Sequence, residues 1–136
     1  MLFVRWLDEK YSVNIGDIDE QHKGLIGIIN EVYRAKVENQ SRKTIAGILE
    51  KMADYTKTHF RAEEELMAEH GFSELEPHRK AHRFFVAKVV EFNRDFSIND
   101  DSIIESILEF LKEWLLTHIM EMDKRYMPYL NEKGIR

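Results

Sequence analysis

Residues 59–82 read HFRAEEELMAEHGFSELEPHRKAH, and this stretch predicts how two helices of the protein are joined. Gly71 suits the position just past the end of a helix, where the backbone often takes a left-handed conformation that glycine adopts without strain. Pro77 suits the first turn of the next helix, because the N–H group that proline lacks would be unpaired there anyway. The stretch therefore predicts two antiparallel helices joined by a short connection.

Apolar residues recur at helical spacing on both sides of this connection and predict four helices in all. A capping run, Asn99-Asp100-Asp101, precedes the last of them, and Pro128 is expected to end it or to start a final short turn. The predicted helices span about residues 19–37, 42–69, 73–97 and 102–128. Their short connections favour an all-α fold, an up-down-up-down antiparallel four-helix bundle.

The chain has 136 residues, a formal net charge of −5 and no cysteine. We expect a single domain over residues 1–136, with the bundle in residues 19–130 and an irregular N-terminal arm in residues 1–18. No basic stripe could follow a nucleic acid backbone, and no stretch approaches the roughly 18 apolar residues of a membrane span. We therefore expect a cytoplasmic protein that binds neither nucleic acid nor membranes, and that holds any metal through nitrogen and oxygen.

Histidines and a glutamate interrupt the apolar faces of the predicted helices. The residues His59 and Glu63 are four positions apart, so both project from one face of the second helix. The same spacing separates His78 and His82 on the third helix. Spacing of this kind is a weak signal by itself, but the neighbouring positions on each face are apolar, which predicts that the four side chains point into the core.

These residues are predicted to meet at one end of the bundle, together with His22 from the start of the first helix and His118 from the end of the fourth. About 16 residues lead from His22 to the first turn and about 17 lead back to His59, roughly 24 and 26 Å at helical rise. A buried polar group without a partner costs about 1–3 kcal/mol. Five histidines at one level therefore favour a metal site over a core of unpaired imidazoles.

Asp123 follows His118 by five residues, which places it about 140° around an ideal helix. Either Asp123 is not a ligand, or the helix is distorted between the two residues. A π-type turn would bring them into line, and such turns occur at functional sites. The residues alone leave both alternatives open.

Four motifs of the chain resemble those of the hemerythrin family in its bacterial single-domain form. They are IDEQH at 18–22, HFRAEE at 59–64, HRKAH at 78–82 and WLLTHIMEMD at 114–123. The resemblance spans almost the whole chain, and it implies a non-haem di-iron centre that binds dioxygen reversibly. It also implies that the helix departs from α geometry between His118 and Asp123.

The resemblance implies how the ligands are divided. One iron would take His78, His82 and His118, and the other would take His22 and His59. The carboxylates Glu63 and Asp123 would bridge the two, along with an oxo or hydroxo group, and Trp114 and Leu115 would wall the oxygen pocket. Two further residues are less defined: Tyr126 either donates a hydrogen bond to the ligand shell or only packs, and His70 is expected to lie at a helix end outside the site.

The expected function is that of an oxygen carrier, store or delivery protein, not an enzyme, with dioxygen as its ligand and an oxygen-consuming enzyme as a client. A monomer is expected. Two alternatives stay open at this point. One is a di-iron enzyme that acts on peroxide or nitric oxide, and the other is an iron buffer.

Overall fold

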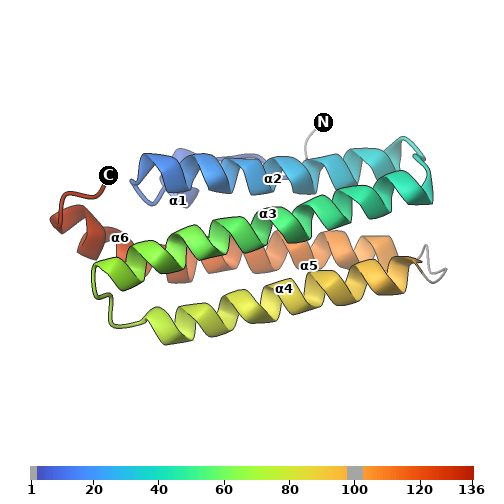
Figure 1. Cartoon of the computed structure of the whole chain (residues 1–136). Helices are drawn as coiled ribbons and strands as arrows, with labels where there is room; N and C mark the ends of the chain where they lie inside the picture. The colour runs from blue at the N-terminus through green and yellow to red at the C-terminus, as the bar shows by residue number, and fades with distance from the viewer. Residues whose placement is uncertain (1–2, 98–102) are drawn as a thin grey trace.

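The structure is a computed structural model that describes residues 3–97 and 103–136, and the described part of the chain is helical (Figure 1). The capping run at 99–101 lies outside the described residues. In chain order the elements are α1 (Asp8–Tyr11), α2 (Gly16–Val37), α3 (Arg42–Glu69), α4 (Leu75–Ser97), α5 (Ile103–His118), the π-helical turn η1 (Ile119–Asp123) and α6 (Lys124–Glu132).

Four long helices form the bundle that the sequence predicted. Helix α2 packs against α3 and α5, and α4 packs against the same two helices, so that each has two neighbours (Figure 1). The short connections make successive helices antiparallel. None of the described helices is both long enough and apolar enough to span a membrane.

The connection between α3 and α4 has the geometry expected for a glycine after a helix end. Gly71 has a φ of +68°, a backbone conformation that is strained for residues with a side chain. Its N–H donates to the carbonyl of Ala68, and the N–H of Phe72 donates to that of Met67. The side chains of Phe72 and Met67 also share an apolar cluster. These contacts complete a Schellman cap and confirm the prediction for Gly71.

The N-terminal arm is more regular than predicted. It contains the single turn α1, and α2 begins at Gly16, three residues before the predicted start. The carboxylate of Asp19 explains this, because it accepts hydrogen bonds from the Ser12 hydroxyl and the Val13 N–H and ties the arm to the helix. Ile18 is buried in the first turn of α2, and its burial favours the earlier start.

The prediction that Pro128 ends the fourth helix or starts a last turn was wrong. Pro128 lies inside α6, which continues to Glu132. Tyr126 and Leu130 are buried on the inner face of α6, whereas Pro128 is exposed. Burial of the inner face therefore outweighs the hydrogen bond that proline removes.

The core is divided into two apolar clusters. The larger one fills most of the bundle, and the smaller one lies beneath α6 and includes Ile18, Met67 and Tyr126. Along α2, a buried histidine at position 22 separates Ile18 of the small cluster from Leu25 of the large one. A buried polar layer of this kind crosses the bundle between the two clusters, and it is where the predicted site residues lie.

Candidate metal centre

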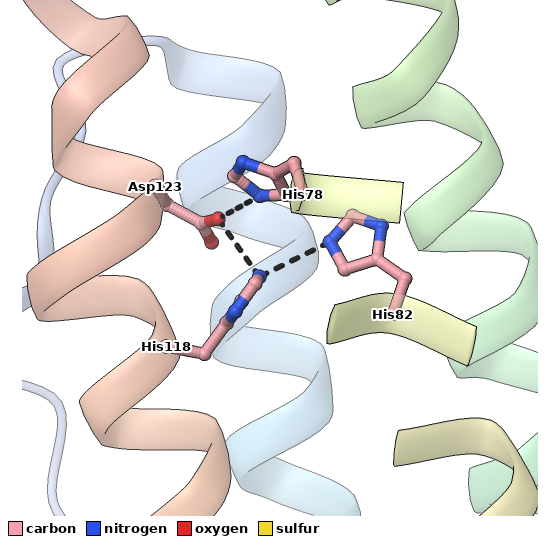
Figure 2. Close-up of side chains that lie close together, drawn as sticks. All are labelled: His78, His82, His118 and Asp123. Atoms are coloured by element: carbon pink, nitrogen blue, oxygen red, sulfur yellow. Dashed lines mark hydrogen bonds and ion pairs between the residues drawn. The ribbon is translucent and has the colours of Figure 1, made fainter. Parts of the chain in front are cut away.

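Two groups of metal-binding side chains lie in the polar layer. In each group the candidate ligand atoms lie within 4.8 Å of one another. The larger group draws its members from α4, α5 and η1, and the smaller group draws them from α2 and α3. The first group is His78, His82, His118 and Asp123 (Figure 2), and the second is His22, His59 and Glu63. The structure thus brings together all seven side chains selected from the sequence, and each is buried.

The π-helical turn η1 aims Asp123 into the bundle. It spans Ile119–Asp123, directly after His118, so the predicted departure from α geometry is confirmed. The wider turn brings residues five apart onto one face. As a result, Asp123 is completely buried and its Oδ1 lies 3.1 Å from His118 Nε2.

Asp123 contacts both groups, and Figure 2 shows its contacts within the larger one. Its Oδ1 lies 2.7 Å from His78 Nε2, on the side of the larger group. Its Oδ2 lies 3.1 Å from His22 Nε2, on the side of the smaller group. One carboxylate therefore faces two sets of imidazoles, with one oxygen toward each.

Glu63 has a similar position between the groups. Its Oε1 lies 2.7 Å from His59 Nε2, 3.9 Å from His22 Nε2 and 3.8 Å from His82 Nε2. Its Oε2 accepts a hydrogen bond of 2.6 Å from the hydroxyl of Tyr126. The hydrogen bond expected as one alternative for Tyr126 is therefore present, and the ring also packs against Phe72 and His78.

The buried charges shift one another's proton affinities. Burial acts to lower the pKa of His22, but the negative charges of Asp123 and Glu63 outweigh it and raise that pKa to about 10. Burial lowers the pKa of His82 to about 4, and the neighbouring histidines add to this. Burial raises the pKa of Tyr126 well above its usual value, and the charge of Glu63 adds to it, so the hydroxyl keeps its proton and donates.

Several atoms of the layer lack ordinary hydrogen bonds. Among the described residues, His22 Nδ1 and Nε2, His59 Nε2, Glu63 Oε1 and Asp123 Oδ2 are buried without one. Four of these five atoms lie within ion-pair distance of another of them, yet not in hydrogen-bond geometry. Buried polar atoms that face one another without hydrogen bonds are costly unless a cation lies among them. Imidazole nitrogen and carboxylate oxygen are suitable donors for divalent iron, so the residues fit a metal pair.

A second layer of side chains orients the histidines. Gln21 Oε1 accepts from His59 Nδ1 at 2.6 Å, and Glu64 Oε2 accepts from His82 Nδ1 at 2.8 Å. Each contact places the ring N–H outward and leaves Nε2 free to bind a metal. Sequence reasoning did not single out Gln21 or Glu64, although each is next in sequence to a predicted ligand and lies inside a quoted motif.

Three residues near the site have different surroundings. Trp114 is half-buried and stacks on the ring of His118, with centroids 4.5 Å apart, and both residues line an open groove of about 350 Å³. Leu115 is buried in the large apolar cluster. His70 lies at the C-terminal cap of α3, where its carbonyl accepts from Tyr129, and it belongs to neither group of candidate ligands.

Replacing Tyr126 with phenylalanine is expected to lower the free energy of unfolding by about 1.5–3 kcal/mol, because it leaves a buried carboxylate oxygen without its donor. Urea unfolding of the metal-loaded protein measures this. Tyr11→Phe is the matched control: Tyr11 is buried too, but its hydroxyl donates to none of the described residues. Equal losses in both variants would contradict a specific role for the bond to Glu63.

Comparisons with known proteins agree with this geometry. Residues 13–130 match the family model described as the hemerythrin HHE cation binding domain. The chain is 32% identical to a bacteriohemerythrin of Stenotrophomonas maltophilia, over 93% of this chain and 80% of that protein. It is 26% identical to a bacteriohemerythrin of Methylococcus capsulatus, over 96% and 99% of the two chains.

A solved structure shares the fold. The crystal structure of wild-type hemerythrin superposes with a TM-score of 0.85 at 25% identity, and the match covers 93% of this chain and 96% of that one. The family model, the relatives and the solved structure therefore all match the part of the chain that forms the bundle and its polar layer.

Proposed function

This chain belongs to the hemerythrin family, and from that premise we propose that it binds dioxygen reversibly at a non-haem di-iron centre. Members of the family bind a di-iron centre, and the buried donor set described above fits one. The observation that carries the proposal is Asp123, whose two oxygens face separate groups of imidazoles. A carboxylate in that position is suited to join two metal ions.

The proposed ligands follow the two groups. His78, His82 and His118 would hold one iron, and His22 and His59 would hold the other. Glu63 and Asp123 would bridge them, since each contacts histidines of both groups. The iron held by two histidines would then have fewer protein ligands, and dioxygen would bind on that side. When bound, a ferrous iron pair supplies the electrons that hold dioxygen.

The protein's own residues favour binding over chemical attack. Imidazole-rich coordination is softer and less anionic than the carboxylate-rich shells of other di-iron bundles. Apart from the proposed ligands and the tyrosines, Thr56 is the only described residue whose buried side chain ionises or carries a hydroxyl. Its hydroxyl donates to a backbone carbonyl. The hydroxyl of Tyr126 keeps its proton and donates a hydrogen bond to Glu63. No spare acid or base is thus offered to a substrate by this part of the chain, which favours a carrier over an enzyme.

The decisive experiment is an optical spectrum of the reduced protein before air, after air and after removal of oxygen. We expect an oxygenated spectrum that forms and disappears reversibly, and about two iron ions per chain without haem, because a bridged site needs both ions. Iron that oxidises in one step without a reversible phase would contradict oxygen carriage. Turnover of peroxide or nitric oxide at a useful rate would favour the enzyme alternative.

Replacing Leu115 with serine is expected to leave the iron content unchanged and to speed autoxidation several-fold. Leu115 is buried one turn before His118, and a small polar residue there would admit water to a site that a dry wall protects. The measurement is the decay rate of the oxygenated spectrum.

The matched control is Leu111→Ser, because Leu111 is buried on the same helix one turn further from the site. Both changes remove a core leucine and cost about 2–5 kcal/mol of stability. Both proteins are therefore compared at a temperature where circular dichroism shows them folded. If the two variants decay at the same rate, Leu115 does not wall the oxygen pocket.

A further inference from the structure

An open groove runs between α3 and α4 on the outside of the bundle, beside the larger group of candidate ligands. Its volume is about 460 Å³. The two helices that form it lie side by side in Figure 1. The groove is lined by Lys57, Phe60, Arg61, Glu64, His82, Arg83, Val86 and Ala87.

The groove has an excess of unpaired positive charge. Lys57, Arg61 and Arg83 are exposed and form no ion pair with any residue in the described part of the chain. The one acid of the lining, Glu64, is already engaged by His82 and Arg79. The chain as a whole has a formal net charge of −5, so a local cluster of three free cations runs against its overall charge.

The floor of the groove is apolar. It contains Phe60 and Val86, and Val90 continues the same stripe of α4 one turn further with 49% of its surface exposed. Arginines around an aromatic and aliphatic centre are typical of the residues enriched at protein interfaces. An open surface of this shape does not enclose a small molecule, which favours a protein partner over a free anion.

Phe60 and His82 connect the groove to the metal site. The ring of Phe60 stacks on that of His82, with centroids 3.8 Å apart and planes only 3° from parallel. His82 itself is among the lining residues. A protein docked in the groove therefore lies next to a proposed iron ligand.

We propose that this groove is the docking surface of an acidic electron-donor protein that carries an iron–sulfur cluster or a flavin and keeps the iron pair reduced. This rests on the proposed function, because an oxygen carrier works only in the ferrous state. In each docking event one electron leaves the reduced cofactor, which is oxidised, and one ferric ion becomes ferrous. Two such events return a diferric centre to the diferrous form.

The test uses an acidic plant-type [2Fe–2S] ferredoxin as the probe. Its binding to the iron-loaded protein is measured by calorimetry with both proteins oxidised, so that no electron flows. Binding is expected to weaken steeply between about 0.01 and 0.15 M salt, where the Debye length falls from about 30 to 8 Å. In a second measurement, stopped-flow absorbance follows reduction of the ferric centre by reduced ferredoxin.

The variant Lys57→Glu/Arg61→Glu/Arg83→Glu is expected to lower both affinity and reduction rate at least about tenfold. The matched control is Arg5→Glu/Lys43→Glu/Arg136→Glu, which alters one lysine and two arginines that are also exposed but do not line the groove. It changes the net charge equally and is expected to retain binding and rate within about twofold.

Three results would overturn the proposal: no salt-dependent binding by the unmodified protein, equal losses in both triple variants, or loss of binding without a slower reduction. Failure of the proposed function can be told apart from failure of the docking proposal. An absent or irreversible oxygenated spectrum would contradict oxygen binding, but docking between the oxidised proteins could still be measured. Reduced basic cytochrome c serves as a probe of opposite charge, and binding of it in the groove would likewise overturn the charge argument.

Discussion

Replacing Asp123 with asparagine is expected to reduce the iron content from about two ions per chain to well below one. Both oxygens of Asp123 contact imidazoles, one in each group, and the side chain is completely buried. Asparagine keeps the shape but loses the negative charge that offsets the metal and offers one oxygen where two are needed. Metal analysis after purification in the presence of ample iron measures the effect.

The control for this variant lies in the same π-helical turn. Glu121 belongs to η1 but is exposed, so Glu121→Gln makes the same chemical change without touching the polar layer. His70→Ala is a second control, because His70 lies outside both groups. Iron loss of similar size in either control would show that the ligand shell has been assigned incorrectly.

Removing the metal is expected to lower the free energy of unfolding by several kcal/mol, since each buried polar atom left unpaired costs about 1–3 kcal/mol. The size of the loss should depend on pH. Urea unfolding of chelator-treated and iron-loaded protein, from about pH 4 to pH 10, measures both the loss of stability and its pH dependence.

The pH dependence of the metal-free protein follows from its buried ion pairs. Burial acts to raise the pKa of Glu63 and that of Asp123, but the neighbouring histidines outweigh it and lower both. Their contribution to stability is therefore present above the ordinary carboxyl pKa and is lost as the pH falls further. The pKa of His22 is raised to about 10, so its contribution is complete below its ordinary value of 6.5 and is lost as the pH rises through 10.

Metal binding reverses the pH dependence that His22 causes, because a histidine must lose its proton to bind a metal. The stability difference between loaded and metal-free protein is thus expected to grow as the pH rises towards about 10, the pKa of His22 in the metal-free protein. The variant His22→Gln, measured without metal, should lose the decline in stability between pH 6.5 and 10. A decline of unchanged slope would assign it to another group.

The bundle and most of the polar layer could be predicted from local patterns. The spacing of His59 with Glu63 and of His78 with His82 places each pair on one helix face, because helical periodicity depends only on neighbours in the chain. The position of Gly71 was predicted from its neighbours too, because its positive φ depends on the helix end that it follows. Similar numbers of residues between each histidine and the nearest turn then brought the histidines to one end, since short connections leave few ways to pack four helices.

Other features depend on which side chains meet across helices. The helix start at Gly16 follows from the hydrogen bonds that Asp19 accepts from the N-terminal arm and from burial in the first turn. The continuation past Pro128 follows from burial of the inner face of α6. The partners Gln21 for His59 and Glu64 for His82 belong to different helices, so only packing identifies them. The bond from Tyr126 to Glu63 was one of two alternatives until α6 was seen to carry the hydroxyl inward.

The sequence by itself therefore determined the all-helical bundle and the convergence of five histidines and Glu63 at one end, because both follow from periodicity and chain length. Only the tertiary structure decided whether Asp123 joins them. An ideal helix turns Asp123 away from His118, and a π-helical turn turns it inward. Local propensity does not distinguish the two. Contacts with His22 on α2 and His78 on α4 do, since they stabilise the inward carboxylate only after three helices have packed together.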